Sequence, residues 1–296
     1  MTNTYPSGSR LVWKGISWII TSTNMDNVWV DNDTGYLHMV LKKVSGVWTG
    51  VNMEDGTALR LYGKMKWVAA SATLNLERNT TIGLCTYHAP VDGNHNEIDI
   101  EINQWPGYDQ RVWFSNHPAG IDTYPENIHY GVLTSNPKLA DTAVTYIIEW
   151  APDRIYWAVI ASDGQIIIDW SYVPGQGSAD IPNIPSAVCM DILPLAGAYF
   201  PAVGTYFEIV FSDYTFSELS GNASFTTSDI NSGCATQFID TSEGTPTAWS
   251  WNFGDGYTST KKNPIHRYAE NGTYSVTLTV TTALGSDSVT QSVVVS

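Results

Sequence analysis

The segment Asn96-Glu97-Ile98-Asp99-Ile100-Glu101-Ile102-Asn103 alternates strictly between polar and branched apolar side chains. Successive side chains of a β-strand point to opposite faces, so this pattern predicts a strand whose three isoleucines enter a core. The residues expected on the opposite face are Glu97, Asp99, Glu101, Asn103 and, a little further on, Trp105. The segment therefore predicts a β-sheet with three neighbouring carboxylates on its outer face.

Short runs of aromatic, aliphatic and β-branched residues recur along the rest of the chain, with Gly, Pro, Asn and Asp between them. The clearest of these runs are Asn27–Asp31, Tyr36–Leu41, Arg111–Ser115, Tyr146–Trp150, Ile155–Ile160 and Tyr206–Phe211. Helix-period patterns are almost absent, whereas strand-period patterns are frequent. We therefore predict an all-β protein built as a β-sandwich or jelly roll.

Charge and hydropathy exclude two classes of partner. The chain has 296 residues, with 14 Lys and Arg against 29 Asp and Glu, which gives a formal net charge of −15. An acidic surface repels phosphate backbones, so we expect no nucleic-acid partner. The apolar runs are far shorter than the roughly 20 residues that cross a bilayer, so we expect no membrane span.

Residues 1–10 lack the basic start and the apolar run of a secretory signal. This leaves two alternatives, a cytoplasmic protein or an exported protein whose signal peptide is absent from this sequence. Abundant Trp, Tyr, Thr and Ser with few Lys and Glu is typical of extracellular β proteins. We therefore expect an extracellular or cell-surface location.

The three aligned carboxylates allow two interpretations. An amphipathic strand can place acidic residues on a solvated face, but like charges at successive positions on one face repel each other, and such a face usually includes lysines. Glycosidic bond cleavage instead requires a pair of carboxyl groups, one ionised and one protonated. The spacing of Glu97, Asp99 and Glu101 is compatible with that chemistry.

Several segments resemble one enzyme family, in the expected order along residues 10–217. Glu97-Ile-Asp-Ile-Glu101 is similar to the Glu-x-Asp-x-Glu signature of glycoside hydrolase family 16, which includes lichenases and laminarinases. Tyr62-Gly-Lys resembles the Tyr-Gly-Arg strand of that family, and Leu84-Cys-Thr-Tyr87 resembles the strand before the signature. Thr145–Trp157 resembles its Thr-Tyr-x-x-Glu-Trp-x-Pro-Asp-x-Ile-x-Trp stretch.

The resemblance implies a concanavalin A-like jelly roll of two antiparallel sheets, one of them concave and forming a polysaccharide cleft. It implies that Glu97 is the nucleophile, Glu101 the general acid/base and Asp99 the helper between them. A retaining pair of carboxyls lies about 5 to 5.5 Å apart, which a curved strand can provide. This chemistry needs no cofactor, and the absence of His-x-x-x-His spacing agrees with the expectation that there is no catalytic metal.

Alternation on the neighbouring strands predicts the walls of the cleft. In Arg111–Ser115 the residues Val112 and Phe114 suit the core, so the others face the cleft if this strand pairs with the carboxylate strand. Sugar rings stack on aromatic side chains, although each aromatic residue could also be a core residue. The substrate-binding candidates are Tyr87, Asn103, Trp105, Arg111, Trp113 and Ser115.

Two departures from the family leave the polysaccharide open. Met190-Asp191-Ile192-Leu193-Pro194 stands where the family commonly has Asn-Leu-Trp or Asn-Leu-Ala, and Cys85 stands where lichenases have an aromatic residue. A disulfide between Cys85 and Cys189 requires their Cα atoms to lie within about 7 Å of each other, and the sequence does not reveal that distance. We expect free thiols at both positions. The family often holds a structural calcium, for which Asp213 is the candidate ligand.

Residues 221–296 have a different character and suggest a second domain. Trp249-Ser-Trp-Asn-Phe-Gly-Asp-Gly256 and Gly272–Val280 resemble motifs of the PKD (polycystic kidney disease) domain, a small immunoglobulin-like sandwich. In the first motif, Trp249, Trp251 and Phe253 share one face of a strand. We place the boundary after residue 220, with a jelly roll over 1–220 and a PKD domain over 221–296. The resemblance implies a spacer, or a contact with a cell surface or carbohydrate.

The function predicted from these observations is retaining endo-hydrolysis of β-glycosidic bonds in an extracellular polysaccharide of the β-glucan or galactan class. The alternative is a carbohydrate-binding or surface-structural protein that keeps the fold without cleavage.

Overall fold

The structure is a computed structural model. It describes residues 8–21, 27–70, 79–88, 96–103, 109–117, 128–133, 143–173, 181–194, 206–219, 222–230, 234–242, 246–282 and 285–295. Every helix or strand assigned within these ranges is a β-strand, which confirms the all-β prediction. None of the described segments is a helix long and apolar enough to traverse a bilayer. The chain divides into two compact units, Met1–Ser217 and Glu218–Ser296.

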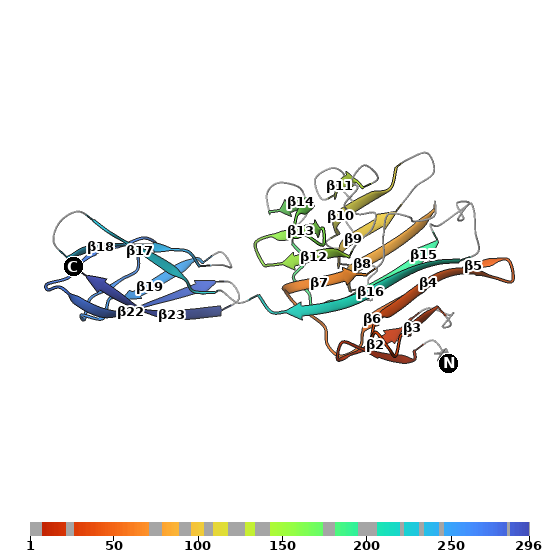
Figure 1. Ribbon diagram of the computed structural model, residues 1–296, viewed down its shortest axis with the longest axis horizontal. Helices are drawn as coiled ribbons and strands as arrows, with labels where there is room; N and C mark the ends of the chain where they lie inside the picture. Colours follow the sequence, from red (N-terminus) through yellow and green to blue (C-terminus); the bar gives the residue numbers. More distant parts are fainter. Residues whose placement is uncertain are drawn as a thin grey trace. The chain divides into compact units, whose positions relative to one another are not determined.

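Two antiparallel sheets make up the first unit (Figure 1). Strands of the first sheet follow the order β1 (Arg10–Trp13), β2 (Ile16–Ile20), β6 (Val51–Asp55), β15 (Ala187–Pro194), β8 (Thr80–His88), β9 (Asn96–Asn103), β10 (Arg111–His117) and β11 (Ile128–Val132). The second sheet runs β14 (Ile166–Tyr172), β13 (Ile155–Ile160), β12 (Val144–Trp150), β7 (Gly63–Ala69), β16 (Tyr206–Ser217), β4 (Leu37–Val44) and β3 (Val28–Val30), with β5 (Val47–Thr49) paired to β4.

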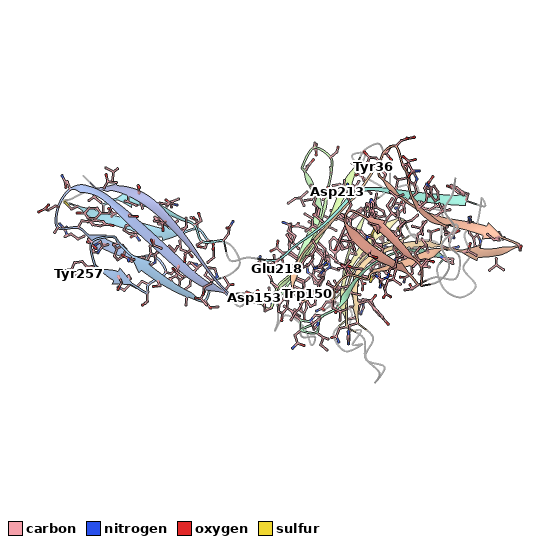
Figure 2. The ribbon with its side chains drawn as sticks, turned by 90° about the horizontal axis from the view of Figure 1, so that it is seen from below. Tyr36, Trp150, Asp153, Asp213, Glu218 and Tyr257 are labelled. Carbon is pink, nitrogen blue, oxygen red and sulfur yellow. A yellow bond between two sulfur atoms is a disulfide. The ribbon has the colours of Figure 1, made fainter. Side chains whose placement is uncertain are left out.

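A single apolar core takes side chains from both sheets of the first unit. Ile98, Ile100 and Ile102 of β9 enter it and are fully buried, as the alternation predicts. Large rings from the second sheet fill the remaining space, among them Trp150 (Figure 2) and Trp157. Burial of these side chains leaves the polar half of β9 on the opposite surface of the first sheet.

The second unit is a smaller sandwich with its own core. Its sheets are β17 (Phe225–Asp229), β18 (Ala235–Asp240) and β21 (Ile265–Arg267), and β20 (Thr258–Ser259), β19 (Ala248–Asn252), β22 (Gly272–Thr282) and β23 (Gly285–Val295). Trp251 and Phe253 are buried and Trp249 packs against the same core, so these three residues share a face as predicted. Gly254 and Gly256, with φ of 81° and 94°, form the turn after β19 in a backbone region that favours glycine.

Candidate active site on the outer face of the first sheet

Three rows of side chains cross the outer face of the first sheet, which we call the carboxylate face. β9 lies between β8 and β10, and β15 lies beyond β8. The row through Glu97 contains Ala187, Tyr87, Glu97 and His117. The row through Asp99 contains Cys189, Cys85, Asp99 and Ser115. The row through Glu101 contains Asp191, Gly83, Glu101, Trp113 and Tyr130.

Asp99 lies at the centre of this arrangement. It is only 6% exposed, and Ser115 Oγ donates to its Oδ2 at 3.0 Å, while His117 Nε2 lies 3.5 Å from the same atom. Burial, the neighbouring charges of Glu97 and Glu101, and a hydrogen bond with Glu97 raise the pKa of Asp99 well above its usual range. A protonated Asp99 can therefore donate to Glu97, as a helper residue must.

Glu101 is half-buried, and its pKa is also raised. Burial, followed by the charge of Glu97, raises the pKa of Glu101 to about 7. A carboxyl with this pKa retains its proton through weakly acidic pH and can release it near neutrality. The carboxylate face thus offers a proton donor beside other carboxyl groups, which is the combination that glycosidic cleavage requires.

An aromatic wall continues the face beyond Glu101. Trp113 Nε1 donates to Asn103 Oδ1 at 2.7 Å, and the ring centroids of Trp113 and Tyr130 are 4.8 Å apart. The Arg111 guanidinium lies 4.5 Å from the Tyr130 ring centroid and 5.8 Å from that of Trp113. Two rings held in this way present a partly exposed apolar surface of the kind on which sugar rings stack.

Most of the site residues predicted from the sequence meet on this face. Tyr87 is 36% exposed in register with Glu97, and Ser115 is buried against Asp99. Trp105 lies outside the described residues. Two residues that sequence reasoning did not select, Tyr130 and Asp191, also belong to the face. Asp191 and Cys189 are two residues apart on β15 and therefore share a face, and this signal was available in the sequence.

The free-thiol prediction for Cys85 and Cys189 is wrong. The two residues are cross-strand neighbours on β8 and β15, their Cα atoms are 5.0 Å apart, and they form a disulfide. Their 104-residue separation hides this pairing from any local pattern. Cys234 is the free cysteine, half-buried in the second unit, and its Sγ donates to Asn271 Oδ1.

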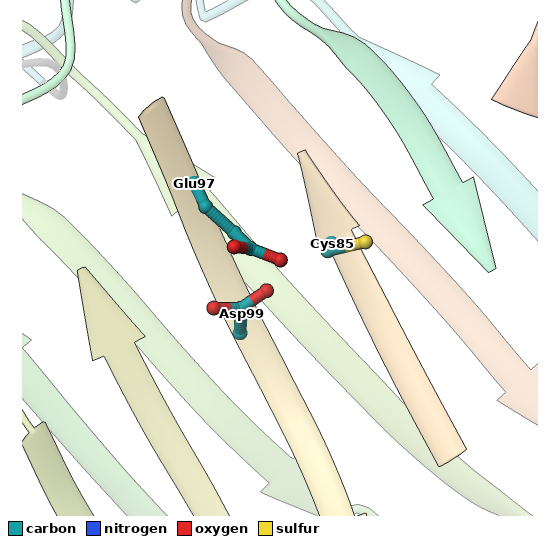
Figure 3. Close-up of side chains that lie close together, drawn as sticks. All are labelled: Cys85, Glu97 and Asp99. Atoms are coloured by element: carbon teal, nitrogen blue, oxygen red, sulfur yellow. The ribbon is translucent and has the colours of Figure 1, made fainter. Parts of the chain in front are cut away.

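Among the described residues, Cys85, Glu97 and Asp99 bring three candidate metal-ligating atoms within 4.8 Å of one another (Figure 3). The Cys85 sulfur is bonded to Cys189 and therefore offers no thiolate. The candidate calcium ligand Asp213, labelled in Figure 2, lies on β16, and its Oδ1 is 3.2 Å from Lys14 Nζ. Calcium binding at Asp213 stays a prediction.

Comparison with known proteins identifies the two units separately. Residues 222–296 match the PKD domain family model. Collagenase ColA of Bacillus cereus is 56% identical over 41 residues, which span 14% of this chain and 4% of the collagenase, so the likeness is confined to a small part of that protein.

Solved structures resemble the first unit. A β-glucanase of Bacillus licheniformis is 20% identical with a TM-score of 0.52, over 74% of this chain and 96% of the other. A pseudo β-1,3-glucanase of Mycobacterium tuberculosis is 12% identical with a TM-score of 0.53, over 73% of this chain and 96% of the other. The first unit therefore has the jelly-roll fold of the glucanases, and the PKD match accounts for the second unit.

Proposed function

We propose that the first unit is a retaining endo-glycosidase that hydrolyses β-glycosidic bonds in an extracellular polysaccharide of the β-glucan or galactan class. The observation that carries this proposal is the arrangement of Glu97, Asp99 and Glu101 on one face, with raised pKa values at Asp99 and Glu101. Groups with different proton affinities divide the work of acid and nucleophile between them. The glucanase fold is compatible with the same proposal, but support for activity comes from the site, because a fold alone does not establish activity.

In the proposed reaction, Glu97 attacks the anomeric carbon while Glu101 donates its proton to the departing glycosidic oxygen. The Glu97 carboxylate forms an ester with the sugar, and the bond to the leaving group breaks with its electron pair on that oxygen. Ionised Glu101 then removes a proton from water, which attacks the ester and releases Glu97. Asp99, protonated and held by Ser115, donates a hydrogen bond that orients Glu97 in both steps.

The substrate would lie along the carboxylate face with its sugar rings on the aromatic side chains. Trp113 and Tyr130 form a platform next to Glu101, and Tyr87 stands at the opposite end beside Glu97. Asn103 accepts a hydrogen bond from the Trp113 indole, and the Arg111 guanidinium contacts the Tyr130 ring. We propose Trp105 as a further platform. A calcium ion bound at Asp213 would be structural and take no part in the reaction.

Three observations support the proposed extracellular location. The Cys85–Cys189 disulfide is typical of proteins that fold in an oxidising compartment. The PKD match and the collagenase likeness agree with this. We propose that the second unit serves as a spacer or contacts a cell surface or carbohydrate.

A second candidate function is carbohydrate binding without cleavage. One of the solved structures with this fold is described as a pseudo β-1,3-glucanase. The segment Met190–Pro194, where the family commonly has Asn-Leu-Trp or Asn-Leu-Ala, contains no Trp, which also fits a changed site.

A reducing-sugar screen separates the two functions. The substrates are mixed-linkage β-1,3/1,4-glucan, laminarin, xyloglucan, agar and carrageenan, each with the wild-type chain and a Glu97→Gln control. New reducing ends with wild type alone support hydrolysis, and NMR of the first product gives its anomeric configuration, expected to be retained. Binding to one polymer with no release by either chain would favour the second function.

A further inference from the structure

A fourth carboxyl group completes the row through Glu101. Asp191 on β15 is in register with Gly83 on β8, and Gly83 is in register with Glu101 on β9. The three residues therefore lie side by side on the carboxylate face, with two carboxyl-bearing residues separated by one that has no side chain. The roles proposed for Glu97, Asp99 and Glu101 leave Asp191 without a function.

The missing side chain at Gly83 makes room for the Asp191 carboxyl. A Cβ atom at Gly83 would lie 2.6 Å from Asp191 Oδ2, closer than any real contact of that kind. The Gly83 N–H donates to Asp191 Oδ1 at 3.1 Å. The Asp191 carboxyl is thus fixed over the Gly83 backbone on β8, on the same face of the sheet as Glu101 on β9.

The two carboxyls cannot both ionise freely in this position. Burial, followed by the charge of Glu101, raises the pKa of Asp191 to about 7, while the Gly83 N–H acts in the opposite direction. Glu101 also has a pKa of about 7. Repulsion between two ionised carboxyls acts on both of them, so we expect the ionisation of Asp191 to disfavour that of Glu101 in turn.

We infer that Asp191 is a positioning residue that shares one proton with Glu101 across Gly83, and that the Gly83 N–H favours the form with the proton on Glu101 by stabilising the Asp191 anion. This inference rests on the proposed function, in which Glu101 must be protonated when the glycosidic oxygen departs. Sharing one proton changes only which of the two carboxyl groups carries it, so no other reactant is required.

Other ionisable groups face this pair from the surrounding strands. They are Glu54 on β6, Tyr87 on β8, Glu97 and Asp99 on β9, Arg111 and His117 on β10, and Tyr130 on β11. Cys85 and Cys189, which belong to the row through Asp99, do not titrate because they are bonded to each other. Of the neighbouring carboxylates, Glu101 acts on Asp191 more strongly than Glu97 does.

The closing experiment titrates the carboxyls of the full chain without requiring turnover. ¹³C-carboxyl NMR follows Glu101, assigned by its loss in Glu101→Gln, in wild type and in Asp191→Asn, whose amide keeps an acceptor for Gly83. The Glu101 midpoint should fall by about one pH unit in Asp191→Asn. The matched control Glu54→Gln, another carboxyl on the same face, should leave the midpoint unchanged.

A Glu101 midpoint that is equal in wild type and Asp191→Asn overturns the inference, whether or not the chain hydrolyses a polysaccharide. If it does, the basic limb of kcat/KM on that polymer should move to lower pH by about one unit in Asp191→Asn. With an aryl glycoside that has a good leaving group, formation of the ester with Glu97 needs no acid, so the rate of that first step should not show this shift. Gly83→Ala, which forces the Asp191 carboxyl away, should lower the Glu101 midpoint in the same direction, and an unchanged midpoint would count against proton sharing.

Discussion

Half-buried carboxyl groups in the two units have different neighbours. In the second unit, Asp255 Oδ2 lies 2.7 Å from His266 Nε2 and Asp240 Oδ2 accepts from the Trp249 indole. Burial alone would raise the pKa of Asp255, but His266 and the Tyr257 N–H outweigh it and lower that pKa. In the first unit, burial raises the pKa values of Glu101 and Asp191, and the charges of neighbouring carboxylates raise them further. A carboxyl that meets donors holds a fold together, whereas carboxyls that meet each other weaken it.

That difference distinguishes acidic residues held by donors from the acidic residues of the proposed active site. A group of mutually repelling acids costs stability, so its presence on one face calls for a role outside folding. The second unit has the same β architecture without such a group among its described residues. The two units therefore serve as internal references for each other in the following predictions.

The largest expected effect is on catalysis. Glu97→Ala should lower kcat by about 10³-fold or more, because the nucleophile is lost, and external azide or formate should restore turnover with an inverted product. Glu101→Ala should instead spare the first step on substrates with good leaving groups, since these need no acid. Steady-state kinetics with both substrate types measures the difference. Equal losses that no anion rescues, in variants that fold normally, would contradict the assigned roles.

The next effect is on the stability of the first unit. Replacing both Cys85 and Cys189 by serine should lower its free energy of unfolding by about 2 to 4 kcal/mol, because the disulfide closes a long loop. Cys234→Ser should leave the first unit unchanged, since that residue lies in the second. Denaturant unfolding with and without a dithiol reductant measures the loss. A count of three free thiols in the unreduced chain would exclude the bridge.

The limits of sequence reasoning follow from these same residues. Alternation along one strand correctly separated Ile98, Ile100 and Ile102 from the acids, because strand period is a local property. The disulfide, and the contact between Asp191 and Gly83, depend on which distant strand pairs with β8. That pairing is set by the packing of the whole sheet. Tyr130 was missed for a related reason, since β11 has only five residues and shows little alternation.

Smaller effects are expected at the aromatic wall. In a Glu97→Gln background, Trp113→Ala should weaken the binding of a long oligosaccharide by about 1 to 3 kcal/mol, while the melting temperature stays nearly unchanged. Trp157→Ala is the matched control, because that ring is fully buried and its loss should cost about 3 to 5 kcal/mol of stability. Calorimetric titration and thermal unfolding separate the two. A sharp fall in melting temperature for Trp113→Ala, with normal affinity, would make Trp113 a structural residue.

The smallest effect compares the two kinds of carboxyl directly, through the pH dependence of stability. The pKa of Asp191 is higher in the folded than in the unfolded chain, so its ionisation removes stability as pH rises from about 4 to about 7. Asp191→Asn should therefore stabilise the first unit at pH 8, by about 1 kcal/mol, and have little effect below pH 4. The pKa of Asp255 is lowered, so its contribution is present above about pH 4 and lost in acid.

Asp255→Asn should consequently destabilise the second unit at pH 8, also by about 1 kcal/mol, because the hydrogen bond with His266 is weakened. Hydrogen exchange in the full chain reads the two units separately, using amides of β8 and β9 for the first and of β22 for the second. At pH 8, Asp191→Asn should raise the stability of the first unit and Asp255→Asn should lower the stability of the second. Each effect should be confined to its own unit. If both changes destabilise, Asp191 is held by donors as Asp255 is, and the carboxylate face is not the strained site that the proposed reaction requires.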